Sequence, residues 1–128
     1  MGKTVYKHDK PLRELQYEQV VDIARLIAFA NMNGYRLRFG DAYRDDRVHG
    51  KYGSKKSYSS AYSNHKLRIA NDMLLDTWDP EEKEWVWETS STAYAELAHE
   101  WEGYRPENVC GIHWHDGNHF SKWYNGRW

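Results

Sequence analysis

Apolar positions in the first third of the chain recur at helical spacing. The residues at three- and four-residue steps are Val20, Ile23, Ala24, Ile27 and Ala30. This period predicts a helix over about Pro11 to Met32 with one apolar face. Pro11 suits the first turn of such a helix, and Gly34 suits its end. The next residues, Tyr35 to Phe39, alternate between apolar and polar, which predicts a strand.

The middle of the chain has two different patterns. From Gly40 to Asn64 no period is sustained, which predicts a loop of about 25 residues, and loops of that length in small domains are usually functional or disordered. Leu67 to Leu75 is the most strand-like apolar segment. A turn is predicted over Trp78 to Glu84, followed by a short strand at Trp85 to Trp87.

A second helical period covers Ser90 to Trp101. Its inner face is Tyr94, Leu97, Ala98 and Trp101. The candidate N-caps are Ser90, Ser91 and Thr92. Gly103 is expected to end this helix, and a closing strand is expected around His119 to Trp123. This order of elements predicts an α+β fold, in which a small antiparallel sheet has helices packed on one face.

Composition limits the class of protein. The chain has 128 residues, which suits a single domain over 1–128, and 16% of them are aromatic, which indicates a compact core rather than disorder. The net charge of -1 argues against a non-specific nucleic-acid binder. There is no apolar run of the roughly 18 residues that a membrane span needs, and no secretory signal is recognised. The single cysteine, Cys110, excludes an internal disulfide and is expected to be a small buried residue.

Histidines and carboxylates provide the candidate chemistry. A catalytic zinc ion needs three protein ligands and one open position, where the bound water has a pKa near ~7. One candidate set is local, with His113, His115 and His119. The other is distributed, with His65, Asp72 and His119, and spacing alone does not decide between them. His65 and Asp72 are seven positions apart, so the two can meet only if His65 lies in a turn before the strand.

Four sequence blocks in order carry a family resemblance: Tyr43 to Gly50, Lys55 to Tyr58, Ser63 to Asp72, and Asp116 to Ser121. They include Ser-x-His-x(6)-Asp and, near the C-terminus, Asp-x-x-His. Together they resemble the zinc peptidases of the D-alanyl-D-alanine carboxypeptidase and L-alanyl-D-glutamate endopeptidase family, with the nearest likeness to small phage endolysins. Each block alone is weak, but four in the right order form a fairly specific signal.

The resemblance implies a hedgehog/DD-peptidase-like fold and a Zn²⁺ cofactor. It implies His65, Asp72 and His119 as the zinc ligands, Asp116 as the general base, and Arg44 as the arginine that binds substrate or the developing oxyanion. The implied activity is hydrolysis of the L-Ala–D-Glu bond in the peptidoglycan stem peptide, for lysis of a host cell. His113 and His115 are then surface residues or groups that orient the ligands.

Other functions stay open at this point. A D-Ala-D-Ala carboxypeptidase would have the same fold, and a non-catalytic zinc-containing module that binds cell wall or protein would need no base at Asp116. A nucleic-acid module is a distant third, although Tyr and Lys/Arg interleave between Arg44 and Tyr62. For an endolysin we expect a monomer, made in the host cytoplasm without a signal peptide, that reaches the wall after membrane permeabilisation. We expect it neither to bind nucleic acid nor to insert stably into the membrane.

Overall fold

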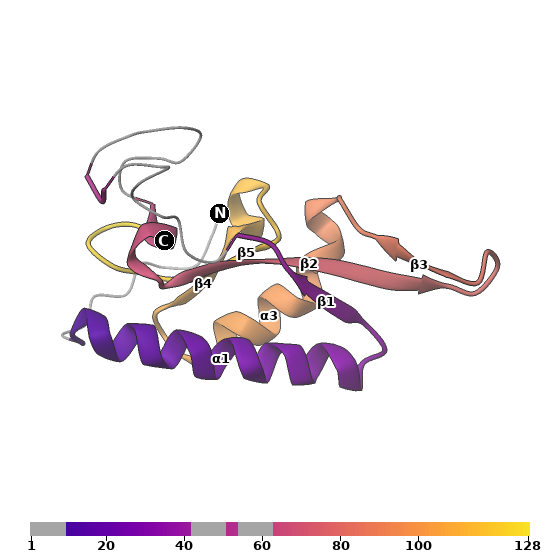
Figure 1. Cartoon of the computed structure of the whole chain (residues 1–128), viewed down its shortest axis with the longest axis horizontal. Helices are drawn as coiled ribbons and strands as arrows, with labels where there is room; N and C mark the ends of the chain where they lie inside the picture. The colour runs from indigo at the N-terminus through magenta and orange to yellow at the C-terminus, as the bar shows by residue number, and fades with distance from the viewer. Residues whose placement is uncertain (1–9, 42–50, 54–62) are drawn as a thin grey trace.

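The computed structural model describes residues 10–41, 51–53 and 63–128, which form an α+β fold (Figure 1). Its helices are α1 (Leu12–Met32) and α3 (Ala95–Tyr104). Its strands are β1 (Arg36–Phe39), β2 (Ala70–Asp79), β3 (Glu84–Trp87), β4 (Asn108–Cys110) and β5 (His119–Lys122). Three short 3₁₀ turns join them, namely η1 (Asn64–Leu67), η2 (Ser91–Tyr94) and η3 (Gly111–Trp114).

The sheet is built around the long strand β2, and all its pairings are antiparallel. β1 pairs with the middle of β2, on one edge of it. On the other edge the neighbour changes along the strand: β5 pairs with residues 70–72 of β2, and β3 pairs with residues 76–79. β4 extends the sheet beyond β5. The change of neighbour leaves an interruption in the ladder between β5 and β3.

Both helices pack on one face of this sheet and enclose the core. Its buried members include Leu26, Ala30, Met73, Leu75, Tyr94, Leu97, Trp101 and Phe120. The Trp101 indole N–H donates to the carbonyl oxygens of Val109 and Ser121, so the largest core side chain satisfies its polar atom on β4 and β5. Because side chains alternate along a strand, the even-numbered residues of β2 lie on the face opposite the helices.

The predicted fold class is confirmed, as is the first helix, which begins one residue after Pro11. Gly34 follows the end of α1 with a φ of 79°, a conformation that glycine adopts at no steric cost. The second helical segment begins with η2 and continues to Tyr104, so the predicted end at Gly103 is wrong. The predicted side-chain cap is wrong as well, because the Ser90 hydroxyl lies 2.9 Å from the Thr92 hydroxyl instead of capping a backbone N–H.

The central strand differs from its predicted bounds at both ends. It begins at Ala70 rather than Leu67, because Leu67 is the last residue of η1 and Arg68 after it has a positive φ. It also continues through Trp78 and Asp79, which pair with β3 although they were predicted in a turn. β4 was not predicted at all, because three residues carry no detectable period.

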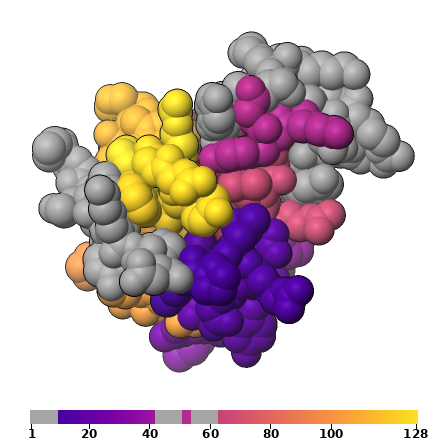
Figure 2. All heavy atoms as spheres, turned by 90° about the vertical axis from the view of Figure 1, so that its left-hand side faces the viewer, coloured from indigo at the N-terminus to yellow at the C-terminus, as the bar shows by residue number. Residues whose placement is uncertain are grey.

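The ends of the described chain lie close together. Figure 2 shows the C-terminal residues packed beside the start of α1 and beside the segment that leads into β2. The Asn64 amide donates to the carbonyl oxygens of Lys122 and Arg127, and the Gln16 amide donates to that of Leu67. Within the described ranges, neither helix combines the length and the apolar character of a membrane span. Most of the predicted loop from Gly40 to Asn64 lies outside the described residues.

Candidate metal centre

A turn before β2 positions the first of the predicted ligands. His65 lies in η1, and its backbone N–H donates to the hydroxyl of Ser63 at 3.2 Å, which caps the turn. Arg68 then adopts a left-handed conformation with a φ of 62°, and the chain enters β2 two residues later. This reversal brings His65 near Asp72, as the seven-residue spacing requires, and leaves the His65 side chain buried.

The other two predicted ligands face each other across a strand pair. Asp72 on β2 is the register partner of His119 on β5, so both side chains project from the same face of the sheet. On the other edge of β2, Gly40 donates its N–H to the carbonyl oxygen of Asp72 at 2.7 Å. A Cβ atom at Gly40 would lie 3.1 Å from the Asp72 Cβ, so a glycine leaves room for the Asp72 side chain.

These three residues, which we call the His–Asp–His group, converge on one point. The Asp72 Oδ1 atom lies 3.3 Å from His65 Nε2 and 3.6 Å from His119 Nδ1. One ligand atom from each side chain falls within 4.8 Å of the others. The two imidazole rings meet edge to face with centroids 5.1 Å apart, and Trp114 packs against His119 at 5.7 Å. Of the two sets left open by spacing, the structure brings together the distributed one.

The His–Asp–His group fits a tetrahedral zinc ion. Ligand atoms about 2.0–2.1 Å from such an ion lie roughly 3.3–3.4 Å from one another, close to the distances between Asp72 and the two rings. The Asp72 Oδ1 atom is buried and has no hydrogen-bond partner among the described residues. Two imidazoles and a carboxylate are a common donor set for zinc, and a buried acceptor without a donor is costly unless a cation satisfies it.

The charge of the group also favours a cation. Burial raises the pKa of the Asp72 carboxyl, but its interactions with His119 and His65 outweigh burial, and the net effect holds the pKa well below its ordinary value. Asp72 is therefore ionised at neutral pH. A buried anion flanked by two nitrogen ligands is a site of negative potential that a divalent cation would neutralise.

Asp116, the predicted base, lies in the turn that leads to His119. Its N–H donates to the carbonyl oxygen of Gly111, and its own carbonyl oxygen accepts from the His119 N–H at 3.1 Å. Two glycines allow this turn to pack closely against neighbouring backbone. A Cβ atom at Gly111 would lie 2.2 Å from the Asp116 carbonyl oxygen, and one at Gly117 would lie 2.6 Å from that of Ser91. The turn is thus held against its surroundings by backbone approaches that only glycine allows.

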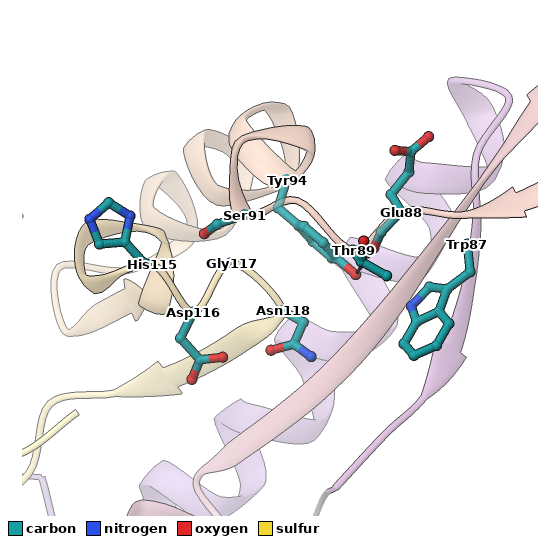
Figure 3. Close-up of a pocket in the computed structure, with 9 residues that line it drawn as sticks. All are labelled: Trp87, Glu88, Thr89, Ser91, Tyr94, His115, Asp116, Gly117 and Asn118. Atoms are coloured by element: carbon teal, nitrogen blue, oxygen red, sulfur yellow. Dashed lines mark hydrogen bonds between the residues drawn. The ribbon is translucent and has the colours of Figure 1, made fainter.

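A cavity of about 300 Å³ opens beside Asp116, where the ladder along β2 is interrupted (Figure 3). Its lining comes from the turn before β5, from the end of β3 and from η2: Trp87, Glu88, Thr89, Ser91, Tyr94, His115, Asp116, Gly117 and Asn118. Figure 3 shows Trp87 across the cavity from Asp116. The Tyr94 hydroxyl fixes one wall, since it accepts from the Leu75 N–H and donates to the Glu88 carbonyl oxygen.

Sequence reasoning did not find the far walls of this cavity. Glu88, Thr89 and Ser91 are separated from Asp116 by about 25 residues, so no spacing argument connects them with it. The small residues of the Asp116 turn were the only available signal. The contact of Trp114 with the His119 ring depends on the η3 turn, which no spacing argument predicts.

Among the described residues, His113, His115 and Cys110 are not part of the His–Asp–His group. His113 Nε2 lies 2.7 Å from the Glu102 carboxylate, and that carboxylate also accepts from the Cys110 N–H. His115 is exposed and lines the cavity instead of joining a ligand set. Cys110 is buried as predicted, and burial raises the pKa of its thiol to about 12. Arg44 lies outside the described residues, so its role stays a prediction.

No family model matches the chain, and no curated protein matches it.

Proposed function

We propose that this protein is a zinc-dependent peptidoglycan peptidase, similar to phage endolysins, that hydrolyses the L-Ala–D-Glu bond of the stem peptide. The observation that carries the proposal is the convergence of His65, Asp72 and His119 on one point, with a buried carboxylate oxygen that has no donor within the described residues. The choice of bond and of family rests on the sequence resemblance stated above.

In this proposal His65, Asp72 and His119 hold the zinc ion on the face of the sheet opposite the helices, which we call the open face. When bound, zinc supplies a Lewis acid that polarises the scissile carbonyl and makes water more acidic. Asp72 contributes negative charge to the site, and the two imidazoles contribute neutral ligands, so the site keeps a net positive charge with the ion in place. Their fixed turns and strand register keep the three ligands in position without reorganisation.

Asp116 acts as the general base in the proposed reaction. It is solvent-exposed and lines the cavity, and in this role it takes a proton from the attacking water and returns it to the leaving amine. The short backbone link between Asp116 and His119 keeps the base at a fixed offset from a ligand. Arg44 is proposed to bind a substrate carboxylate or the oxyanion.

The test of this function is mass spectrometry of purified peptidoglycan after digestion by the zinc-loaded protein, with a chelated sample beside it. We expect fragments that end in L-alanine and fragments that begin with D-glutamate, both absent after chelation. Release of terminal D-alanine alone would assign the carboxypeptidase activity instead. Intact peptidoglycan after treatment with folded, zinc-bearing protein would contradict an enzymatic function and support a binding module.

Replacement of the proposed base separates catalysis from a structural metal site. Asp116→Asn should retain stoichiometric zinc and lose activity by roughly 10²- to 10⁴-fold, the usual contribution of a positioned acid–base group. Zinc content is measured by elemental analysis and activity by fragment release. The matched control is Asp79→Asn on the β2–β3 hairpin, which should keep full activity. Full activity in Asp116→Asn would remove Asp116 from the mechanism.

A further inference from the structure

The open face of the sheet carries a row of aromatic and arginine side chains beyond the metal centre. We call Arg36, Arg38, Trp78, Trp85 and Trp87 the Arg–Trp ladder. Strand register aligns Arg36 with Asp76 and Trp87, and it aligns Trp78 with Trp85. These residues alternate with Leu37 and Leu75, which pack in or against the core, so the ladder lies on the face opposite the helices.

The ladder is preorganised by its own contacts. The Arg36 guanidinium lies 4.1 Å from the centre of the Trp85 ring, and that of Arg38 lies 5.7 Å from the Trp87 ring. The Trp78 and Trp85 rings meet edge to face at 5.5 Å. Trp78 nevertheless remains 47% exposed and Trp87 54% exposed. Exposed rings held in fixed positions lose little conformational entropy when a ligand stacks on them.

The Arg–Trp ladder is continuous with the proposed active site. Asp72 and Trp78 lie on the same face of β2, and a strand rises about 3.3 Å per residue, so the two are roughly 20 Å apart. Trp87 belongs to the ladder and also lines the cavity beside Asp116. Figure 1 shows the β2–β3 hairpin extending past the helices, away from the end of β2 that carries Asp72. A polymer that lies along this face would span both features.

The charges of the Arg–Trp ladder and the hairpin tip indicate which kind of polymer this face can bind. Arg38 is already paired with Asp76 through two hydrogen bonds of 2.7 and 2.9 Å. The hairpin tip adds four carboxylates, namely Asp79, Glu81, Glu82 and Glu84, against the single cation of Lys83. A polyanion such as a nucleic acid is therefore repelled. A neutral polyhydroxylated ligand fits better, since sugar rings present C–H faces to aromatic rings and a hydroxyl rim to side chains that form hydrogen bonds.

We propose that the Arg–Trp ladder binds the glycan strand of peptidoglycan, a neutral polymer of N-acetylhexosamines. This inference rests on the proposed function, because a stem peptide begins at its L-alanine on the glycan and a peptidase that cuts there works beside the strand. The ladder holds the strand along the open sheet face while the stem peptide enters the site near Asp116. It thereby raises the local concentration of stems at the catalytic centre.

The probe is a chitooligosaccharide, an uncharged oligomer of N-acetylglucosamine that presents the sugar faces of the glycan strand, and its binding to the zinc-loaded protein is measured by isothermal titration calorimetry. We expect saturable binding that weakens about tenfold in Trp78→Ala and again in Trp85→Ala, as loss of a stacked ring predicts. Trp78→Phe should restore most of the affinity, because it retains a ring. The matched control is Val86→Ser, since Val86 is exposed on the same hairpin but on the other face.

Three results would overturn the inference. The first is no binding by the wild-type protein, and the second is equal binding by the Trp78 and Trp85 variants, with folding verified by circular dichroism. The third is tighter binding of a single-stranded oligonucleotide than of glycan, which would make the ladder a nucleic-acid surface. A chitooligosaccharide contains no peptide bond, so this measurement is independent of catalysis. Cleavage without glycan binding would leave the proposed function intact, and glycan binding without cleavage would leave the ladder intact.

Discussion

The strand β5 carries a buried charged cluster at each end, and the two clusters differ in how they are satisfied. At its start, His119 belongs to the His–Asp–His group, where a carboxylate oxygen has no donor among the described residues. At its end, Lys122 is fully buried and donates to Asp22 at 2.7 Å and to Asn108 at 2.6 Å. Asp22 also accepts from Arg105 at 2.8 Å.

This second cluster, which we call the Asp22–Lys122 network, fastens α1 to β4 and β5. Its members are buried or half-buried and donate to and accept from one another, so their desolvation is offset by charge-assisted hydrogen bonds. The contrast teaches how to distinguish two uses of buried charge. A satisfied network stabilises the fold, whereas a converging group with an unsatisfied buried acceptor is arranged for something that binds to it.

The largest expected effect comes from removing one histidine of the His–Asp–His group. His65→Ala or His119→Ala should remove zinc and lower activity by at least about a thousandfold, since several kcal/mol of Lewis-acid stabilisation disappear. The chelated protein should also lose some stability, because both rings are buried and their removal leaves a cavity. Zinc content, fragment release and thermal melts measure the three effects. His99→Ala, an exposed histidine on α3, is the control, and an active zinc-loaded His65→Ala would refute the assignment.

Substitutions in the Asp22–Lys122 network should lower the stability of the fold and leave zinc binding intact. Lys122→Met removes one charge from a buried pair and should lower the free energy of unfolding by about 3–5 kcal/mol. At temperatures where the variant is folded, it should keep its zinc. Urea denaturation and zinc analysis test both points. Arg25→Met, which removes an exposed arginine 3.5 Å from the same aspartate, should cost less than about 1 kcal/mol. An equal loss in the two variants would contradict the network's role.

Stabilisation by added zinc should also distinguish the two clusters. A cation that binds only the folded chain should stabilise it by about 2.7 kcal/mol at one hundred times its Kd, and the Tm should rise accordingly. The increase should vanish in His119→Ala and persist in Lys122→Met, because only the first substitution removes a ligand. Differential scanning calorimetry with and without zinc measures it. A zinc-dependent increase of the same size in His119→Ala would place the metal elsewhere.

The smallest expected effect is on acid stability. Burial raises the pKa of Asp22 and of Glu107, but hydrogen bonds from Arg105 and Lys122 to Asp22, and from Lys10 to Glu107, outweigh it, so both values fall below the ordinary 3.8 and 4.5. A carboxyl whose pKa is lowered by folding adds stability above its unfolded pKa. That stability is lost as the pH falls through the lower folded pKa.

We therefore expect the free energy of unfolding of the metal-free protein to decrease below about pH 4, by about 1.4 kcal/mol for each unit of lowered pKa. Urea denaturation across that range measures the decrease. The loss should be smaller in Lys122→Met, because Lys122 helps to lower the pKa of Asp22. A pH profile identical to that of the wild type would show that the lysine does not act on this carboxylate.

Local patterns in the sequence predicted the elements that are long enough to repeat a period several times. The inner face predicted for the second helix is correct. The face predicted for α1 is wrong in part: Ile23 and Ala30 are buried, but Val20 and Ala24 are exposed, and the buried face instead includes Leu15 and Leu26. The three-residue strand β4 and the extension of β2 through Trp78 depend on partners far along the chain. A single strand has no pattern of its own that reveals its neighbour, so these features could not be predicted locally.

The sequence by itself determined the α+β class and the residue types that could hold a metal, because periodicity and chemistry are properties of short segments. It left two ligand sets open. Only the tertiary structure decided between them, since a left-handed residue at Arg68 turns His65 toward β2 and strand register sets Asp72 opposite His119. The same folding buries Lys122 beside Asp22, 100 residues away. Contacts of that separation arise from the closure of the whole chain, and no local window contains both partners.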